Sequence, residues 1–550
     1  MSLSRRTLLL AGSLGPALAC REGAQLGSAE PRFVGQSPER GHLLRSAALL
    51  DGALDGTLRT KVAIVGAGVA GLSAAWRLRK AGLEDIQIFE LEADAGGTAR
   101  TGLMPRSAHP MGAHYLPSPP RECTQLHELL GDLGLLVGRR YDGSLEFETT
   151  AICPAPLERH FHAGEWAPGL YPSAGQTQAE ADQLERFWAL LDRWDRRRDA
   201  HGRLLFRLPV RRSSPTLAHL DRITMAQWLA DQGLDSWRLR WFVDYACRDD
   251  YGCGADQTSA FAGLHHYLGR GLAQNREGQI LTFAGGNGAL VSALRAFLGL
   301  GDRLKLDHLS YAVDPDAGEL RVHDIAAGRS FKVEADLILW AAPRYLLPHV
   351  LPRGRDPLGP ALRQGELSYA PWLVANLELR DSLGGLGAPL SWDNVPVIED
   401  PRARNLGYVV ATHNEGRDRV DTPGSVITYY EPLIPADAST QALRGARARL
   451  LAGSAGEWGE HVLRALEHMH PAIRRQVLQF HLHRWGHAMI RPTPGLIFGD
   501  ALARAREPIA KLRACATDTG GLPLFEEAFY AATDAADWAL AELGGHPITD

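Results

Sequence analysis

The sequence predicts an α/β fold, in which a nucleotide-binding domain with a parallel sheet is interleaved with a second, α+β domain. Three consecutive segments lead to this prediction. Residues 61–65 form a short β-branched run that ends at Gly66, which is typical of a buried strand. A helical stretch over residues 72–81 follows and stops at Gly82. Residues 86–89 then form a second strand, so a Rossmann-like strand–helix–strand unit opens the folded part.

The turn between the first strand and the helix reads Gly-Ala-Gly-Val-Ala-Gly over residues 66–71. Gly66 permits the tight turn, Gly68 lets the backbone approach a pyrophosphate, and Gly71 lets the helix pack close to the strand. Glu90, directly after the second strand, can accept hydrogen bonds from both ribose hydroxyls. An acid there argues against a 2′-phosphate and therefore against NADP. The pattern predicts a bound adenine dinucleotide, either FAD or NAD.

Later segments distinguish these two dinucleotides. Residues 96–100 read Gly-Gly-Thr-Ala-Arg, in which Arg100 can pair with pyrophosphate oxygens. Residues 283–290 precede a short helix, and residues 335–343 form an apolar strand that runs into a proline turn. Residues 512–518 form a strand that ends at Asp518, and a helix over about 525–543 follows. In this order the segments resemble the flavin-containing amine oxidase superfamily, which includes phytoene desaturases, protoporphyrinogen oxidases and UDP-galactopyranose mutases.

The resemblance implies FAD, bound noncovalently because no His or Cys lies in a family attachment motif. By resemblance, Asp518 lies near the pyrophosphate and ribityl chain, and the backbone near Leu309 contacts adenine. The helix start at residues 526–528 directs N–H groups at the flavin N1/C2=O edge. The implied cofactor-binding residues are Gly66, Ala67, Gly68, Ala70, Gly71, Glu90, Gly97, Arg100, Gly112, Ala113, Leu309, Asp518 and Ala528.

The resemblance also implies how the two domains alternate along the chain. Residues 60–118, 276–364 and 485–550 are expected to form the FAD-binding domain, and residues 119–275 and 365–484 the substrate domain. Residues 20–59 are expected to be a linker. The substrate pocket should lie between the two domains.

Three residues are candidates for catalysis. His114 and Tyr115 belong to a stretch that, by resemblance, passes beside the isoalloxazine ring, although a packed loop without substrate contact is the alternative. Trp485 resembles the family's aromatic segment, with His487 as a second pocket candidate and a structural Trp as the alternative. Residues 241–252, where aromatic and charged residues alternate, form either a polar pocket wall or a helix whose Arg248 pairs with its neighbours.

The sequence lacks one residue that several members of the family carry in their active site. Several amine oxidases place a Lys on a strand that matches residues 372–378, and no Lys occurs there. This difference puts amine oxidation in doubt. His481 and His483 share one strand face, but no third ligand is suitably spaced, so no metal site is expected.

The N-terminus has the features of an export signal. Arg5 and Arg6 precede an apolar stretch over residues 8–19, and residues 17–19 offer a small-residue cleavage site. We therefore expect residues 1–19 to be a twin-arginine signal peptide, too short to span a membrane permanently, that directs the protein to the periplasm through the twin-arginine machinery. Cys20 follows directly and leaves a lipid anchor open. Of the other cysteines, Cys247 and Cys253 either pair or remain thiols.

Composition limits the class of partner. The formal net charge is −5, and the 59 basic residues include only five Lys, so there is no basic surplus for nucleic acid. The expected function is that of an exported FAD-dependent oxidoreductase that takes a hydride from a C–N or C–C bond of a small organic substrate onto flavin N5. A desaturase or redox-neutral flavoenzyme and a non-catalytic FAD-binding partner protein are the alternatives. The oligomeric state is left open.

Overall fold

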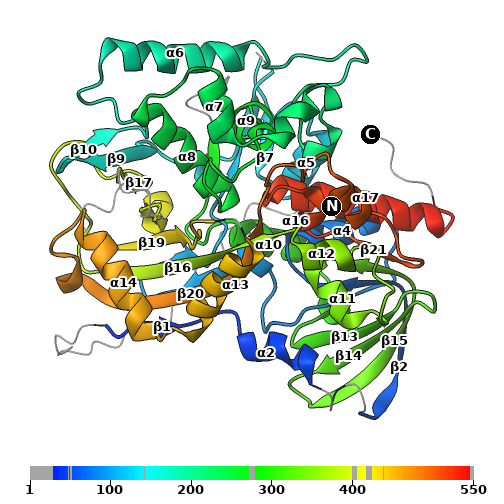
Figure 1. The fold of residues 1–550 in the computed structure, drawn as a ribbon. Helices are drawn as coiled ribbons and strands as arrows, with labels where there is room; N and C mark the ends of the chain where they lie inside the picture. The colour runs from blue at the N-terminus through cyan, green and yellow to red at the C-terminus, as the bar shows by residue number, and fades with distance from the viewer. Residues whose placement is uncertain are drawn as a thin grey trace.

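The computed structural model describes residues 29–46, 49, 52–141, 143–271, 279–398, 405–415, 424–437 and 439–545. The predicted signal peptide and Cys20 lie outside these residues. Figure 1 shows two sheets side by side, a seven-stranded one at the lower right and an eight-stranded one at the left. Within the described ranges no helix is both long and apolar enough for a membrane span.

The first domain is built on the seven-stranded sheet, whose strand order is β12-β3-β2-β15-β14-β13 with β21 beside β15. Strands β2, β3, β12, β15 and β21 pair in parallel, and β13–β15 form an antiparallel meander. Helices α4 (Val69–Lys80) and α17 (Phe525–Glu542) pack against each other beside this sheet. The strands are β2 (Leu54–Val65), β3 (Ile86–Phe89), β12 (Leu304–Lys305), β13 (His308–Asp314), β14 (Glu319–Asp324), β15 (Arg329–Trp340) and β21 (Leu512–Ala514). The α/β fold with its strand–turn–helix unit is therefore confirmed.

The second domain is built on the eight-stranded sheet, in the order β1-β20-β16-β19-β18-β17-β9-β10. β16 is buried along its whole length, because β20 and β19 flank it and helix α13 packs on it. Such a strand is apolar at almost every position, as a buried strand should be. The strands are β1 (Arg32–Phe33), β9 (Glu158–His162), β10 (Glu165–Pro168), β16 (Tyr369–Leu379), β17 (Asp393–Pro396), β18 (Tyr408–Val410), β19 (Ser425–Pro432) and β20 (Val477–Ile490).

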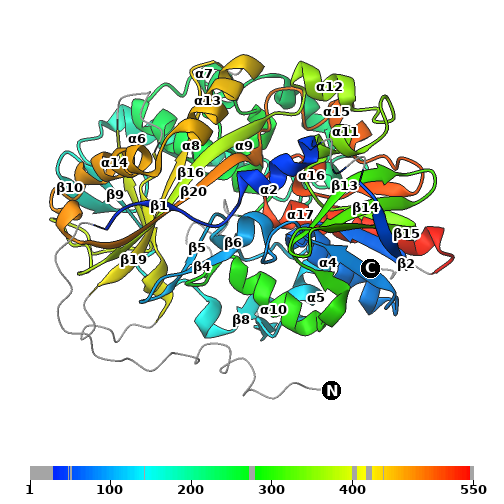
Figure 2. The same cartoon turned by 90° about the horizontal axis from the view of Figure 1, so that it is seen from below.

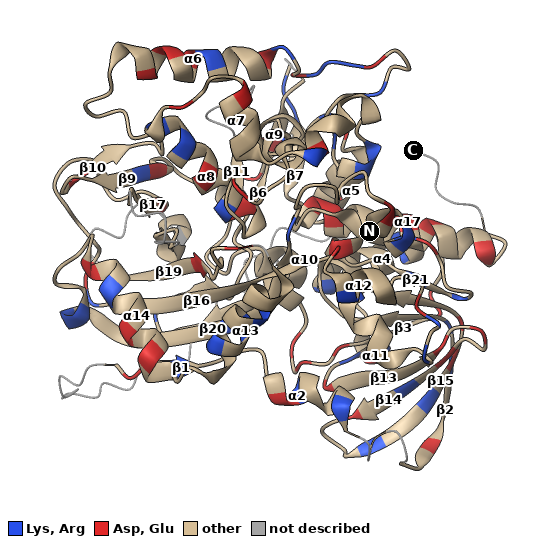
Figure 3. Ribbon diagram, viewed as in Figure 1, with Lys and Arg blue, Asp and Glu red and all other residues tan. Residues whose placement is uncertain are grey.

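Helices and short hairpins fill the space between the sheets. Acidic and basic residues are interspersed over these elements (Figure 3). The two-stranded sheets are β4 (Thr101–Leu103) with β5 (Ala108–Pro110), β6 (Tyr115–Pro117) with β11 (Ile280–Thr282), and β7 (Leu136–Arg139) with β8 (Leu145–Phe147). The remaining helices are α2 (Pro38–His42), α5 (Thr124–Asp132), α6 (Gln178–Asp192), α7 (Met225–Asp231), α8 (Trp237–Tyr251), α9 (Ala260–Leu268), α10 (Gly288–Leu298), α11 (Leu347–Val350), α12 (Gly359–Gln364), α13 (Thr440–Ala452), α14 (Ala455–Glu467), α15 (Asp500–Ala505) and α16 (Thr517–Gly520).

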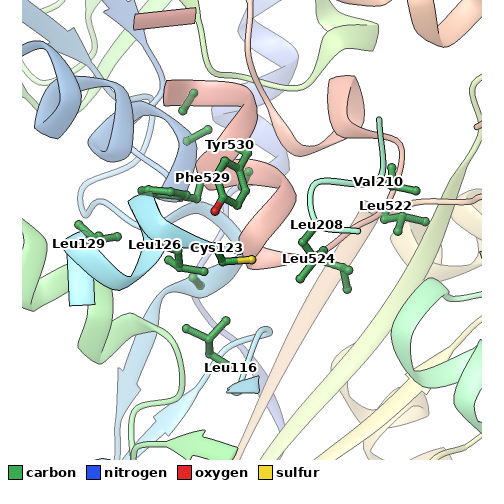
Figure 4. Packing of buried hydrophobic residues seen from close by; sticks show 14 of the residues in the cluster. Leu116, Cys123, Leu126, Leu129, Leu208, Val210, Leu522, Leu524, Phe529 and Tyr530 are labelled. Atoms are coloured by element: carbon green, nitrogen blue, oxygen red, sulfur yellow. The ribbon is translucent and has the colours of Figure 1, made fainter. Parts of the chain in front are cut away.

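One large hydrophobic cluster connects the helices of both parts. Figure 4 shows Phe529 and Tyr530 of α17 beside Leu126 and Leu129 of α5. Helices α6–α9, which belong to the stretch expected in the substrate domain, bury side chains in this same cluster. The interleaved segments therefore share a core. The described cysteines are buried and free, so Cys247 and Cys253 are separate thiols.

The segment over residues 29–46, which we call the N-terminal arm, lies within the stretch expected to be a linker. Its strand β1 pairs in parallel with β20 of the second domain, and its helix α2 follows. Both Figure 1 and Figure 2 show α2 between the two sheets. Strand β2 also starts at Leu54, before the expected boundary at residue 60. These parts of the linker are folded because their backbone groups join the two sheets.

Candidate functional site

A cavity of about 690 Å³ lies between the two domains. This volume falls in the range of small-molecule and cofactor sites. The first domain lines it with the turn after β2, the segment before β4 and the start of α17. The second domain lines it with β16, β19 and β20, and the N-terminal arm contributes a further wall.

Two glycine turns meet at one end of the cavity. Gly66 has φ of 101°, which an L-residue with a side chain rarely adopts. A Cβ atom on Gly71 would lie 1.9 Å from the Gly66 carbonyl oxygen, so only glycine lets α4 pack this close to the turn. The Gly96 N–H donates to the Ala67 carbonyl at 2.9 Å, which fixes the second turn against the first. Gly68 and Gly97, one from each turn, both line the cavity.

Glu90 supports the first turn from behind. Its carboxylate accepts hydrogen bonds from the backbone N–H groups of Ala67 at 2.7 Å and Glu92 at 3.0 Å. Burial raises the pKa of Glu90, against the lowering effect of these two bonds. Each carboxylate oxygen can accept a second hydrogen bond, so the side chain retains capacity for a ligand hydroxyl.

A second group of predicted residues surrounds Arg100. The Arg100 side chain is buried, its Nε atom has no hydrogen-bond partner among the described residues, and Glu92 lies 3.8 Å away. A Cβ atom on Gly112 would lie 2.5 Å from the Thr98 carbonyl oxygen. Only a residue without a side chain therefore lets the Gly112 backbone pack this closely against the segment before β4. An unsatisfied guanidinium N–H next to two glycine turns is a suitable environment for an anion.

Asp518 lies where β21 leads into α16, and it faces the cavity. Its Oδ2 atom accepts hydrogen bonds from the Arg344 backbone N–H at 2.6 Å and the Tyr369 hydroxyl at 2.7 Å. Its Oδ1 atom is buried and has no partner within the described part of the chain. Burial raises the pKa of this carboxyl. Oδ1 is thus oriented and free to accept a hydrogen bond from a ligand hydroxyl.

Helix α17 starts at the cavity. Leu524, Phe525 and Ala528 line it, so the first backbone N–H groups of an 18-residue helix are close to its interior. The side chains of Glu526 and Glu527 are buried away from solvent. Burial raises the pKa of Glu527 to about 7. The helix dipole adds positive potential here, which favours a ligand atom that acquires negative charge.

His114 and Tyr115 lie inside the cavity and are packed in an aromatic cluster. The His114 ring stacks on Tyr430 with a centroid distance of 4.6 Å, and Trp392 lies 5.5 Å from it. Burial lowers the pKa of His114 to about 4, so the ring is neutral near pH 7. Both residues line the cavity, and whether either contacts a substrate stays a prediction.

Tyr115 is held by a buried ionic cluster. Its hydroxyl donates to Asp250 at 2.8 Å, and Arg270 binds the same carboxylate at 3.0 Å. Arg270 also pairs with Glu526 at 3.3 Å, and His266 contacts Asp250. Burial alone would raise the pKa of Asp250, but the charges of Arg270 and His266 hold it well below its ordinary value. A buried carboxylate with these partners remains ionised and fixes the Tyr115 hydroxyl.

Trp485 and His487 line the cavity from β20. The indole N–H of Trp485 donates to the Met111 carbonyl at 2.8 Å, which fixes the ring beside the Gly112 backbone. His487 stacks on Tyr345 with a centroid distance of 4.4 Å, and burial lowers its pKa to about 3. The rings of Trp485 and His487 therefore give this wall of the cavity an aromatic, uncharged surface near neutral pH, and Arg484 and Arg447 add positive charge beside it.

The predicted residues divide into two groups. Those that line the cavity are Gly68, Ala70, Gly97, Gly112, Ala113, His114, Tyr115, Trp485, Asp518 and Ala528. The others, Gly66, Ala67, Gly71, Glu90, Arg100 and Leu309, are not lining residues. Five of these support or adjoin the glycine turns, whereas Leu309 is a core residue of β13. Leu309 is the register partner of His323 on β14, and its backbone contact with adenine stays a prediction.

Sequence reasoning missed several lining residues. Arg270, Tyr345, Tyr369 and Arg447 reach the cavity only through the tertiary fold, and no local pattern marks them. The arm residues had a signal, because Ser37 followed by Pro38 is a typical helix start. Each of the two interpretations of residues 241–252, a polar pocket wall and a helix with an internal ion pair, describes part of this segment. Arg248 pairs with Asp244 within α8, and Asp249 and Asp250 at its end line the cavity.

Position 376 on β16, within the strand where family members carry a Lys, is occupied by a buried polar pair. The Asn376 carbonyl oxygen faces Nε2 of His483 at 2.9 Å, and Nδ1 of His483 faces the Val34 carbonyl at 3.0 Å. Burial lowers the pKa of His483 well below its ordinary value, and a neutral imidazole carries one N–H, so the ring can donate to only one of these two oxygens at a time. Over the described residues no group of three or more His, Cys, Asp or Glu side chains is arranged to hold a metal.

Comparison with known proteins supports the architecture. A family model described as an NAD(P)-binding Rossmann-like domain matches residues 64–133. Comparison of the sequence with curated proteins finds no match. Among solved structures, a putrescine oxidase with bound putrescine has a TM-score of 0.62 and 17% identity, over 88% of this chain and 100% of that one.

Two further structures come from other enzymes. Cyclohexylamine oxidase from Brevibacterium oxydans IH-35A has a TM-score of 0.59 and 18% identity, over 88% of this chain and 99% of that one. A fatty acid isomerase from P. acnes that produces CLA has a TM-score of 0.60 and 15% identity, over 86% of this chain and 97% of that one. At these identities the similarity shows the fold. The chain thus has a mixed α/β architecture with a Rossmann-like domain, and its structural neighbours include amine oxidases.

Proposed function

We propose that this protein is an FAD-dependent oxidoreductase of the amine oxidase type, which removes a hydride from a C–N or C–C bond of a small organic substrate. One observation carries the proposal. Two glycine turns, the free Oδ1 of Asp518 and the start of α17 all face a single cavity between two domains. The glycine turns offer an anion site, Asp518 offers a hydroxyl acceptor, and α17 offers a helix N-terminus. A dinucleotide needs all three in the same cavity.

The residues around the cavity fit a noncovalent FAD. The turn at Gly68 and Gly97, with Arg100 behind it, would hold the pyrophosphate. Asp518 would accept a hydrogen bond from the ribityl chain through Oδ1, and the α17 N-terminus would meet the N1/C2=O edge of the ring. Glu90 would add an acceptor for the ribose. When bound, FAD supplies the hydride acceptor, N5 of its ring.

The remaining residues would bind and orient the substrate. Trp485, Tyr430 and His114 provide apolar ring surface that excludes water from the reacting bond. Tyr115 presents a hydroxyl whose position is fixed by Asp250. Since burial raises the pKa of Tyr115 well above its ordinary value, this hydroxyl stays protonated and acts through orientation and hydrogen bonding.

A second candidate is a desaturation or a redox-neutral reaction. The resemblance to amine oxidases leads one to expect a Lys on the strand at residues 372–378, and none occurs there. Position 376 of this strand is Asn. The fold similarity to a fatty acid isomerase supports this candidate as well.

Export through the twin-arginine pathway is also part of the proposal, and it rests on residues 1–19 of the sequence. Anchoring through Cys20 would place the enzyme at a membrane surface.

An absorption spectrum of the purified protein, before and after acid precipitation, tests the cofactor. Flavin bands that move into the supernatant are the expected result, and a colourless protein that takes up no FAD would overturn the proposal. Anaerobic titration with a panel of amines then separates the two reactions. Bleaching by one amine supports the oxidase, whereas flavin that no amine reduces moves the assignment to the second candidate. Steady-state O2 uptake identifies the electron acceptor.

A further inference from the structure

We propose that the N-terminal arm, residues 29–46, is part of the cofactor site and controls how fast a bound dinucleotide leaves it. The arm runs from the second domain to the first, as Figure 1 and Figure 2 show, and five of its residues line the cavity. The inference rests on the proposed function, because it takes FAD as the ligand of that cavity.

The arm is attached to the second domain by strand pairing. Arg32 and Phe33 pair with His481 and Leu482 of β20, and the Val34 N–H donates to the Leu482 carbonyl at 3.0 Å. The Arg484 guanidinium lies 3.9 Å from the Phe33 ring centroid. Regular backbone pairing in a large sheet makes this attachment the firm one.

The attachment to the first domain is made of side-chain and loop contacts. The Ser37 N–H donates to the Glu92 carboxylate at 3.2 Å. Arg40 donates to the Leu91 carbonyl at 3.1 Å and forms an ion pair with Asp307. The Arg40 and Asp307 side chains are 28% and 27% exposed, so water competes with this ion pair. Leu44 also packs against the hydrophobic cluster of the first domain. Apart from the Leu44 contact this end of the arm is held by partly exposed polar contacts, so we expect it to be the end that opens.

These contacts lie next to the residues that support the dinucleotide turn. Leu91 and Glu92 follow Glu90 directly, and Glu90 holds the Ala67 N–H of the first glycine turn. Beyond its attachment to the second domain the arm lines the cavity with Gln36, Ser37, Pro38, His42 and Arg45. A ligand bound at Gly68 and Gly97 would therefore lie in the cavity that these arm residues line.

The position of the arm has a thermodynamic consequence. A ligand that contacts the closed arm stabilises the closed state, and by linkage a closed arm holds the ligand more tightly. If the arm must open before FAD leaves, the release rate is proportional to the fraction of open arm. The arm follows the predicted cleavage site at residue 19, so the exported protein would keep it.

The test compares FAD release from the full-length holoprotein and its Arg40→Ala variant after dilution, followed by the recovery of free-flavin fluorescence. Loss of two hydrogen-bond partners at a partly exposed position should speed release about 5- to 30-fold. Asp307→Asn should give a smaller increase and preserve the positive φ of 59° at that residue, since Asn tolerates it. Arg59→Ala is the control, because Arg59 forms an exposed ion pair with Glu334 outside the arm and should leave release unchanged.

Hydrogen exchange of residues 32–45 in the FAD-free and FAD-loaded protein gives an independent result. FAD should slow exchange in the arm, and equal exchange in both forms would overturn the inference. Release rates of both arm variants within twofold of the wild type would overturn it as well. A wild-type protein that binds no FAD would instead contradict the proposed function, so the two failures are distinguishable.

Discussion

The Gly71→Ala substitution tests the assignment of the glycine turn most directly. Gly71 lies in the first turn of α4, where the helix packs against the end of β2. The added methyl group would lie 1.9 Å from the Gly66 carbonyl oxygen and 3.0 Å from its carbonyl carbon. Both neighbours are backbone atoms, so no side-chain rotation can relieve the clash.

The expected cost follows from this geometry. A Cβ atom normally keeps about 3.2 Å or more from an oxygen, so α4 and the turn must separate by more than 1 Å. Such overpacking of a core contact costs about 3 kcal/mol or more. With an unfolding entropy of about 2 cal/mol/K per residue, a chain of this length should then melt roughly 3 °C lower. The displaced turn should also raise the Kd for FAD by tenfold or more, since the N–H groups at Gly68 move.

Thermal melting of the FAD-free protein and titration with FAD measure the two effects. Gly131→Ala is the matched control, because Gly131 lies in helix α5 and nothing occupies the space around its Cβ position within 4 Å. That variant should be as stable as the wild type or more stable, by up to about 1 kcal/mol of helix propensity. A Gly71→Ala protein with the melting temperature and FAD affinity of the wild type would refute the assignment of this turn.

Four further predictions concern three single side chains and the arginine pair of the signal peptide. Burial and a neighbouring carboxylate raise the pKa of Asp249 to about 7, above an unfolded value of about 4. The unfolded chain therefore loses this proton first, and the contribution of Asp249 to stability falls as pH rises from about 4 to 7. The melting temperature of Asp249→Asn relative to the wild type should be higher at pH 8 than at pH 5, and a constant difference would contradict the pKa. Tyr115→Phe should retain FAD but slow flavin reduction by the productive substrate at least tenfold in stopped-flow measurements, and equal rates would remove Tyr115 from the catalytic residues. Glu90→Ala should weaken FAD retention and cost about 1–3 kcal/mol of stability, because two backbone N–H groups lose their acceptor; a fully yellow, equally stable variant would argue against the ribose assignment. Replacing Arg5 and Arg6 with Lys should trap the precursor in the cytoplasm, and an unchanged periplasmic yield would refute the export prediction.

The sequence by itself determined the first strand–turn–helix unit and the positions of its glycines. These features are local, because a tight turn, a helix start and a strand end each depend on a few consecutive residues. The same is true of Asp518 and of the helix that starts at Phe525, which the structure places at the cavity. The sequence also located His114 and Tyr115, through the stretch that resembles a family segment.

Only the tertiary structure decided which distant residues complete the site. Asp250 and Arg270 are 20 residues apart in sequence and meet at Tyr115 from different parts of the chain. Arg270 follows α9 and has no local pattern, because the need for a buried cation arises only when Asp250 and Glu526 are brought beside it. The N-terminal arm shows the same limit. Its short strand is stable only against β20, which lies about 450 residues away in the sequence. The sequence of residues 29–46 alone therefore looks like that of a linker.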